Sequence, residues 1–315
     1  MALRVVFLGT PDFAVPSLKS LVAAGHEVLA VFTQPDRPKG RGQEQTASPV
    51  KRTALELNLP VHQPLKIRQP EVAEFLRGLN PDAIVVVGYG QIIPQSIIDI
   101  PALGIVNVHA SLLPKYRGAA PIQWAIANGE ARTGVTTMRI DAGLDTGDIL
   151  LVWECDIGPE ETAPELSDRL ADAGARLLVE TIDGLVSGAI TPVPQDHAQA
   201  SHAPILKKED GFIDWAWPAS QVHNRVRGFQ PWPGAYTSFR GELLKIWRTA
   251  RTMTFTSAGP GGVLVQGGRM FVACGDGCAI ELLEVQLAGG KRLSASVFLN
   301  GHPLREEEIL GESTS

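Results

Sequence analysis

Apolar residues in the first half of the chain gather in short continuous runs. The runs that predict strands cover residues 4–8, 27–33, 83–87 and 105–109. A strand without regular polar alternation is typical of a sheet that is buried on both faces. Where helical segments separate such strands, the strands form a mostly parallel sheet with helices on both sides. We therefore predict an α/β fold with a Rossmann-like, doubly wound sheet.

Turn and cap residues mark the helices between these strands. Gly9, Thr10 and Pro11 indicate a turn after the first strand, and Asp12 is the expected N-cap of a helix that Gly25 ends. Further helices are expected from Ser48 and Pro49 onward and over 70–77, 120–127 and 163–186, and further strands over 134–139 and 149–155.

The pattern changes in the last third of the chain. Residues 188–206 are rich in proline, alanine and polar residues without a sustained apolar period, and we predict a linker there. We expect a Rossmann-like catalytic domain over 1–187 and a smaller domain over 207–315. The second domain has five short strands between glycine-rich turns, over 236–239, 243–249, 262–266, 270–273 and 279–285. Five such strands fit a small OB-like β-barrel.

Composition narrows the class of protein. The 315 residues are long enough for two domains, and 44% of them are hydrophobic. A formal net charge of -6 gives no overall basic excess, so a nucleic-acid partner would need a local basic patch. Three cysteines are too few for a disulfide framework, and no segment approaches a membrane span. We expect a cytoplasmic protein.

Asn107 and His109 lie at the end of the predicted strand 105–109. Side chains alternate along a strand, so the two lie on the same side. An amide next to an imidazole suits acyl transfer, in which one group donates to a developing oxyanion and another moves a proton. Ligands of such sheets bind beyond the carboxyl ends of the strands, near the point where the strand order reverses, and we expect the pair there. A histidine with a purely structural role fits the same pattern.

Residues 141–148 bring three carboxylates and two glycines together. They lack the ligand spacing and final glutamate of a calcium loop, so we expect no metal. If Asp145 lies beside His109, its carboxylate fixes the imidazole tautomer and stabilises the charged ring. An ordinary turn between two strands also accounts for the segment.

The polar segment 34–51 carries Arg37, Lys39 and Arg41. It is too long for an ordinary connection in a compact domain, and its positive charges suit phosphates. A solvated, mobile loop is the alternative, because two acidic residues dilute the charge.

Lys207 and Lys208 follow the predicted linker and are well placed to contact a phosphate backbone. Several tryptophans of the second domain lie near arginines in the sequence. They could stack on single-stranded nucleic acid, although packing inside the domain is the stronger alternative. These residues are Trp215, Trp217, Trp232 and Trp247.

Two other chemistries lack the residues that they need. The turn from Gly9 to Asp12 has no second and third glycine of a G-x-G-x-x-G loop, which argues against a nicotinamide enzyme. Cys274 and Cys278 have no two further ligands nearby in the sequence, which argues against a zinc site.

The sequence Asn-Val-His-Ala-Ser-Leu-Leu-Pro at 107–114 resembles that of the folate-dependent formyltransferases. Tyr-Arg-Gly at 116–118 and Asp-Thr-Gly at 145–147 strengthen the resemblance, and the two-domain length agrees over nearly the whole chain. Gly-Thr-Pro-Asp-Phe at 9–13 and Gln-Pro-Asp-Arg-Pro at 34–38 look like the branch that formylates methionyl-tRNA. That branch is more basic after its Gly-Arg-Gly than the Gln-Glu-Gln-Thr found here at 43–46.

The resemblance implies transfer of a formyl group from 10-formyltetrahydrofolate, the co-substrate, to the α-amine of methionyl-initiator tRNA, a step of translation initiation. It assigns Asn107, His109 and Asp145 as catalytic residues and implies no metal. It also implies that Arg41 and the surrounding loop contact the acceptor stem of the tRNA. The residues implied to line the folate site are Ser111, Leu112, Leu113 and Pro114.

Two alternatives remain at the level of sequence. A folate-dependent formyltransferase that acts on a nucleotide-linked amino sugar would share the motif at 107–114. A non-catalytic tRNA-binding protein would use the second domain and the segment 34–51, with a structural Asn-His pair. We expect a monomer without an obligate protein partner, although the residues leave the oligomeric state open.

Overall fold

The computed structural model describes residues 2–39, 44–305 and 307–311. They divide into two compact units. Unit 1 comprises residues 1–121, 132–156 and 167–204, and unit 2 comprises 122–131, 157–166 and 205–315. Within the described ranges, no helix is both long and apolar enough to cross a membrane.

A seven-stranded sheet forms the centre of unit 1 in its described residues, with the order β10-β9-β7-β6-β1-β2-β5. The strands from β7 to β5 pair in parallel, whereas β9 and β10 are antiparallel to their neighbours. The mostly parallel Rossmann-like sheet predicted from the apolar runs is therefore confirmed. The strands are β1 (Arg4–Gly9), β2 (Glu27–Phe32), β5 (Val61–His62), β6 (Ala83–Val87), β7 (Ile105–His109), β9 (Arg132–Arg139) and β10 (Ile149–Asp156).

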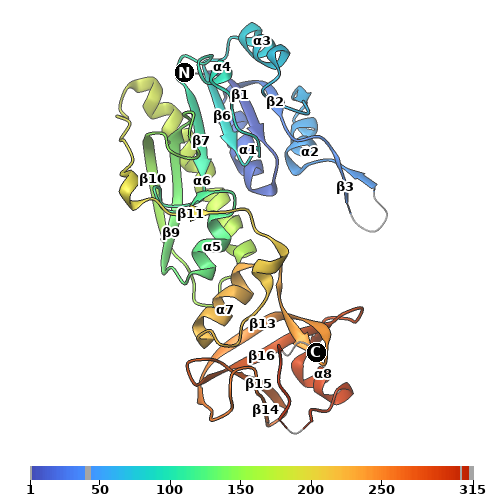
Figure 1. The fold of residues 1–315 in the computed structure, drawn as a ribbon. Helices are drawn as coiled ribbons and strands as arrows, with labels where there is room; N and C mark the ends of the chain where they lie inside the picture. Colours follow the sequence, from blue (N-terminus) through green and yellow to red (C-terminus); the bar gives the residue numbers. More distant parts are fainter. Residues whose placement is uncertain (1, 40–43, 306, 312–315) are drawn as a thin grey trace. The chain divides into compact units, whose positions relative to one another are not determined.

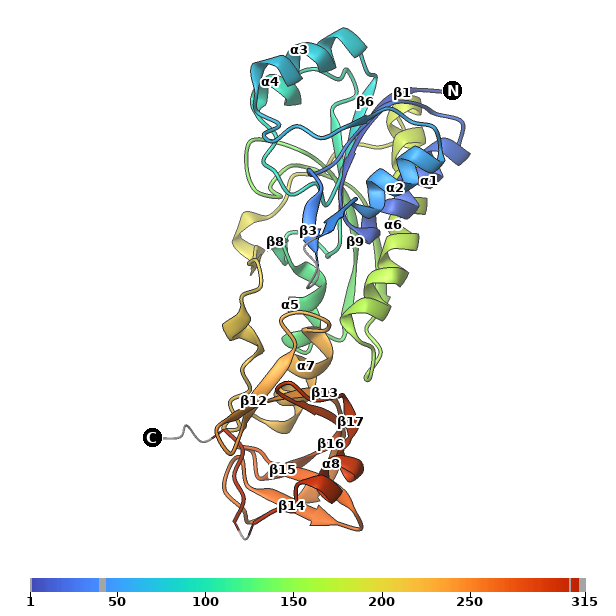
Figure 2. The ribbon, with the colours of Figure 1, turned by 90° about the vertical axis from the view of Figure 1, so that its right-hand side faces the viewer.

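Helices cover both faces of this sheet, with α1, α2 and α6 on one side and α3 and α4 on the other (Figures 1 and 2). Ala73 and Leu76 of α3 pack with Val6 and Ile84 of the strands, whereas Gly174 of α6 lies directly against Val108 of β7. The helices are α1 (Val15–Ala23), α2 (Pro49–Glu56), α3 (Pro70–Leu79), α4 (Gln95–Ile98) and α6 (Ala163–Ser187).

The start of the first helix differs from the prediction. Asp12 is not its N-cap, because a short 3-10 turn, η1 (Asp12–Ala14), precedes α1 and is itself capped by Pro11 without a side-chain hydrogen bond. The α-helix begins at Val15, which places Pro16 in its first turn. A proline is tolerated there, because the backbone N–H groups of the first turn have no partner inside the helix.

The segment 34–51 is more regular than the predicted loop. Strands β3 (Arg37–Lys39) and β4 (Glu44–Thr46) form an antiparallel pair in which Arg37 faces Thr46. The expected helix start after Ser48 is confirmed, since its hydroxyl accepts a hydrogen bond from the backbone of Lys51.

The point where the strand order reverses lies between β1 and β6, because β2 and β5 continue on one side of this pair and β7 on the other. His109 does end its strand, as expected, but β7 is separated from β1 by β6. The Asn-His pair therefore lies at the carboxyl end of a strand near the reversal, as expected, with one strand between them.

Unit 2 is built on an antiparallel sheet with the order β12-β13-β16-β15-β14, and β17 pairs with β16. The predicted strands are confirmed, but the pairs among the described residues form an open path in which β12 and β14 do not meet. The strands are β12 (Ala235–Phe239), β13 (Glu242–Phe255), β14 (Val263–Gln266), β15 (Arg269–Ala273), β16 (Cys278–Leu287) and β17 (Leu293–Ser294).

The described residues of unit 2 also form the α-helices α7 (Ala219–Gly228) and α8 (Ala295–Gly301), which the sequence did not predict. Helix α5 (Pro121–Ala127) was predicted, and all of it but its first residue belongs to unit 2. Helix α7 buries Ala219, Val222 and Val226, a helical spacing among otherwise polar residues. These side chains pack with Leu244 and Ile280 of the sheet.

Candidate active site

The imidazole of His109 is buried at the carboxyl end of β7, and each ring nitrogen has a distinct neighbour. Nε2 lies 2.9 Å from the carbonyl oxygen of Tyr116, and Nδ1 lies 3.7 Å from Oδ2 of Asp145. A carbonyl can only accept, so Nε2 carries the proton in the neutral ring and Nδ1 has its lone pair free. The structure therefore brings His109 and Asp145 together, which the sequence could not establish.

Asp145 reaches this position from a tight loop between β9 and β10. Its φ angle of 51° is in the left-handed region, and its Oδ2 accepts a hydrogen bond from the backbone N–H of Gly118 at 2.8 Å. Asp141 stabilises the loop, since its Oδ1 accepts from the backbone of Gly143 and from the hydroxyl of Thr146. The turn suggested as the simpler interpretation exists, and it also carries a carboxylate to the histidine.

Asn107 lies two residues before His109 in β7 and is likewise buried. Strand geometry directs the two side chains to the same face of the sheet. Its backbone lies between Val86 of β6 and Met138 of β9. Asn107 is thus held in a strand that is paired on both sides, with its side chain on the same face as the imidazole.

The implied folate residues follow β7 directly and differ in exposure. Ser111 is fully buried and its hydroxyl donates to the carbonyl of Lys115, so it stabilises the loop itself. Leu113 is buried too, and its N–H donates to the hydroxyl of Thr136. Leu112 and Pro114 are partly exposed.

The predicted tRNA contacts fall in both units. Arg37 is exposed at the start of β3, and Lys207 and Lys208 are exposed at the start of η3 (Lys208–Gly211). Lys39 ends β3, whereas Arg41 lies outside the described residues.

Sequence reasoning assigned no role to three buried residues around the site. Thr136 of β9 faces His109 in the sheet register, and its hydroxyl donates to the carbonyl of Ser111. Arg117 and Gln195 bond to each other, and Gln195 also holds the Asp145 loop. The Tyr-Arg-Gly motif includes Arg117, but its partner Gln195 lies in the segment 188–206, whose composition predicts a linker.

The aromatic residues of unit 2 divide between core and surface. Trp215 is buried and donates to the hydroxyl of Thr237, and Trp217 is covered by the guanidinium of Arg225. Burial lowers the pKa of Arg225. Trp232 is 55% exposed. Packing inside the unit thus accounts for Trp215, and Trp232 is accessible to a ligand.

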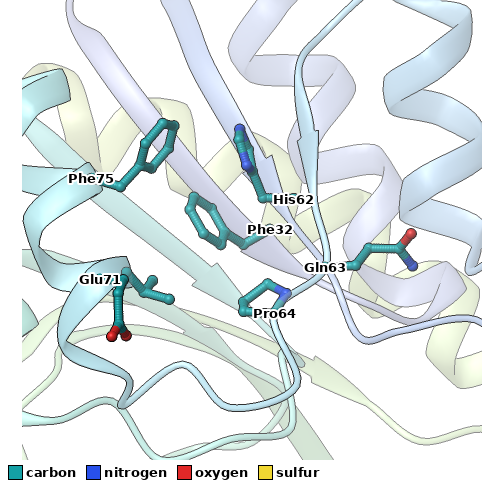
Figure 3. A pocket seen from close by; sticks show the side chains of 7 residues that line it. Phe32, His62, Gln63, Pro64, Glu71 and Phe75 are labelled. Atoms are coloured by element: carbon teal, nitrogen blue, oxygen red, sulfur yellow. The ribbon is translucent and has the colours of Figure 1, made fainter.

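A cavity of about 270 Å³ lies at the other flank of the sheet, beside β2 and β5. Figure 3 shows the rings of Phe32, His62 and Phe75 gathered there, with Gln63 pointing away from them. Burial lowers the pKa of His62. Strands β6 and β1 separate this cavity from His109, so it is not the site of the Asn-His pair.

No group of three or more His, Cys, Asp or Glu residues within the described ranges could hold a metal ion.

The family follows from comparison with known proteins. Residues 3–182 match the model for formyl transferases, and residues 205–303 match that for the formyl transferase C-terminal domain. The chain belongs to the formyl transferase family. It is 63% identical to the methionyl-tRNA formyltransferase of Solibacter usitatus (strain Ellin6076) over 98% of this chain and 99% of the relative. It is 58% identical to that of Koribacter versatilis (strain Ellin345) over 99% of both chains.

A solved structure supports the fold. A sugar 3N-formyl transferase, crystallised in the presence of dTDP and 5-N-formyl-THF, superposes with a TM-score of 0.68 and covers 92% of this chain and 100% of its own. Its sequence identity is 19%, so this likeness concerns the fold alone. The predicted family and its two-part fold are confirmed.

Proposed function

We propose that the chain transfers the formyl group of 10-formyltetrahydrofolate to the α-amino group of methionyl-initiator tRNA. The observation that carries the proposal is the buried His109 with Asp145 at 3.7 Å, at the end of β7. Relatives 51–63% identical over nearly the whole chain carry the methionyl-tRNA name, whereas the sugar enzymes are similar at 21% identity or less.

In the proposed reaction the amine nitrogen attacks the formyl carbon and forms a new C–N bond, which gives a tetrahedral intermediate. The intermediate collapses when the bond from that carbon to N10 of the folate breaks. The free Nδ1 of His109 accepts the proton that leaves the amine, and the adjacent carboxylate of Asp145 stabilises the imidazolium. His109 then returns the proton to N10. No covalent bond to the enzyme is needed.

Asn107 supplies the remaining part of the mechanism. Its amide donates a hydrogen bond to the oxyanion of the tetrahedral intermediate, and Nδ1–H of the charged His109 is a second donor. Both side chains belong to β7 and are buried, so they are oriented before the substrate binds.

For the folate, we propose the loop of residues 111–114. Since the hydroxyl of Ser111 is used by Lys115, its contribution is to shape the loop, and the partly exposed Leu112 and Pro114 face the ligand. For tRNA phosphates, we propose the exposed Arg37, Lys207 and Lys208 together with Lys39 and Arg41.

The decisive experiment incubates purified protein with 10-formyltetrahydrofolate and methionyl-initiator tRNA, and measures formylmethionine after deacylation. A dTDP-linked amino sugar replaces the tRNA in a parallel reaction. Formylation of the tRNA alone supports the proposal, and formylation of the sugar alone overturns it. Retention of tRNA without binding of a folate analogue would identify a non-catalytic binding protein.

We further propose that the protein acts in the cytoplasm as a monomer. The sequence contains three cysteines, too few for a disulfide framework, which suits a reducing compartment. Light scattering of the purified chain at several concentrations tests the monomer, and a mass of twice 33.7 kDa would contradict it.

A further inference from the structure

The side chain of Gln195 connects the Asp145 loop to a buried arginine. Its nitrogen Nε2 donates to the carbonyl oxygens of Asp145 at 3.0 Å and Gly147 at 2.7 Å. Its oxygen Oε1 accepts from the guanidinium of Arg117, with the closer nitrogen at 2.6 Å. Gln195 is 6% exposed, so both ends of its amide are used inside the protein.

Arg117 determines which way round this amide lies. A guanidinium can only donate, and it is itself buried, so Oε1 of Gln195 must face it. The NH₂ group of Gln195 then faces the Asp145 loop, where two carbonyls can only accept. The nearby Nδ1 of His197, 3.1 Å from the guanidinium, occupies a further donor of Arg117.

One of the two carbonyls that Gln195 binds belongs to the residue with the strained backbone, Asp145, and the other lies two residues later. Asp145 has a left-handed backbone, which residues other than glycine rarely adopt, and a conformation of this kind persists where its surroundings hold it. This conformation directs its carboxylate to the N–H of Gly118 and toward Nδ1 of His109.

We propose that Gln195 is a positioning residue for formyl transfer. Its amide holds the backbone of residues 145–147 so that the Asp145 carboxylate faces His109. The inference rests on the proposed function, because it gives Asp145 its role in proton transfer. Gln195 itself touches neither substrate.

Two substitutions separate positioning from packing. Gln195→Ala removes the whole contact, whereas Gln195→Glu keeps the size and the acceptor for Arg117 but loses the donor, because the guanidinium favours the ionised carboxylate. We expect both to lower kcat about 10- to 100-fold, with the KM for tRNA and for folate changed less than about twofold. Gln199→Ala is the control, since Gln199 is exposed and bonds to Asp196 beside it.

A double-mutant cycle with Asp145→Asn tests whether Gln195 affects kcat through Asp145. If Gln195 acts through Asp145, then Gln195→Ala changes kcat little in the Asp145→Asn background. A wild-type kcat in Gln195→Glu, or an equal loss with and without Asp145→Asn, would overturn the inference. If Gln195→Ala does not fold, the cycle is run with Gln195→Glu.

The two proposals fail in different ways. Wild-type protein that forms no formylmethionine would refute the proposed function before any variant is compared. Wild-type protein that formylates tRNA, with full turnover in the Gln195 variants, would refute only the positioning role. Hydrogen exchange of the backbone amides around 145–148 gives a second readout, and we expect it to rise in both Gln195 variants and not in Gln199→Ala.

Discussion

The two nitrogens of the His109 ring have different neighbours. The contact with the Tyr116 carbonyl fixes the orientation of the ring, and leaves Nδ1 toward the carboxylate of Asp145. At 3.7 Å the carboxylate is beyond a normal hydrogen bond to Nδ1. In the proposed mechanism, the position of the Asp145 loop therefore decides how close this carboxylate comes to the ring.

The role of Asn107 predicts a large loss of turnover when its amide is removed. Loss of one oxyanion donor typically costs about 10² to 10³ in kcat, and we expect Asn107→Ala to fall in this range with little change in folate binding. Steady-state formylation kinetics and a folate-binding titration measure the two quantities.

The exposed Asn300 of α8 provides the control for this substitution, because Asn300→Ala removes the same group far from β7 in the sequence. Turnover of Asn107→Ala within threefold of the wild type would remove Asn107 from the oxyanion role.

Some residues of this site could be predicted from the sequence because of their chemical type and spacing. Asn107 and His109 share a strand face because of the two-residue period, and Asp145 stands in an unusual cluster of carboxylates. Gln195 carries no such signal, since it stands in a proline-rich stretch and its importance comes from contacts with residues 117 and 145. Thr136 carries no signal either, because it is an ordinary strand threonine whose partner, Ser111, lies in the loop after the neighbouring strand.

Elements were predictable where a single pattern decides them. The apolar runs of β6 and β7 were predicted to the residue, because both strands are buried along their whole length. Helix α7 was missed since its few apolar residues are outnumbered by polar ones that form contacts of their own. The pair β3 and β4 was missed because short polar strands have no apolar alternation.

Two very short strands link the proposed linker to the site. Strand β8 (Arg117–Gly118) pairs in parallel with β11 (His202–Ala203), and the N–H of Gly118 binds Asp145. A Cβ atom at Gly118 would lie 2.6 Å from the carbonyl oxygen of Ala203, and the φ angle of 120° is also unsuited to a side chain. The pairing therefore requires glycine.

Substitution of Gly118 should accordingly impair both folding and turnover. We expect Gly118→Ala to push β8 from β11 and to lower kcat about tenfold or more through the displaced Asp145. Gly25→Ala is the matched control, since Gly25 also has a positive φ but its Cβ would meet no atom within 4 Å. Equal kcat in the two variants would show that the β8–β11 contact does not matter to the site.

His223 on α7 makes the stability of unit 2 depend on pH. Its Nε2 lies 3.3 Å from the carbonyl of Pro159, and its Nδ1 lies 2.9 Å from the hydroxyl of Thr249. Burial lowers the pKa of His223 below its ordinary value of 6.5, although the nearby Glu160 partly opposes this. The unfolded chain therefore binds a proton more readily than the folded one.

The sign of the effect follows from this difference. The contribution of neutral His223 is complete above about pH 6.5 and is lost as the pH falls toward its lower folded pKa. We expect His223→Gln to lower the free energy of unfolding by about 1 to 2 kcal/mol at pH 7.5, so that the variant unfolds at a lower urea concentration than the wild type. The difference in free energy between the two proteins should be smaller at pH 5. Tryptophan fluorescence follows the transition, and the exposed His202→Gln serves as control. The same difference in free energy of unfolding at both pH values would contradict the prediction.

At the scale of the whole molecule, charge sets how a nucleic acid can bind. The chain has a net charge of -6, so long-range attraction to tRNA must come from local groups of positive side chains. Lys207 and Lys208 are exposed neighbours near the start of the last segment of unit 2, residues 205–315, and Arg37 is exposed in unit 1. Each phosphate contact adds roughly one unit to the slope of log affinity against log salt concentration.

Removal of the lysine pair is therefore expected to act on tRNA and not on chemistry. Lys207→Ala with Lys208→Ala should raise the KM for tRNA about tenfold at moderate salt and reduce the salt slope by one to two, because two phosphate contacts are lost. Folate binding and kcat at saturating tRNA should stay near wild type. The control combines Lys19→Ala with Lys291→Ala, which changes net charge equally at two other exposed positions. If both double variants raised KM alike, net charge would explain the effect; if only the pair at 207 and 208 did so with a lower salt slope, these lysines contact the tRNA backbone.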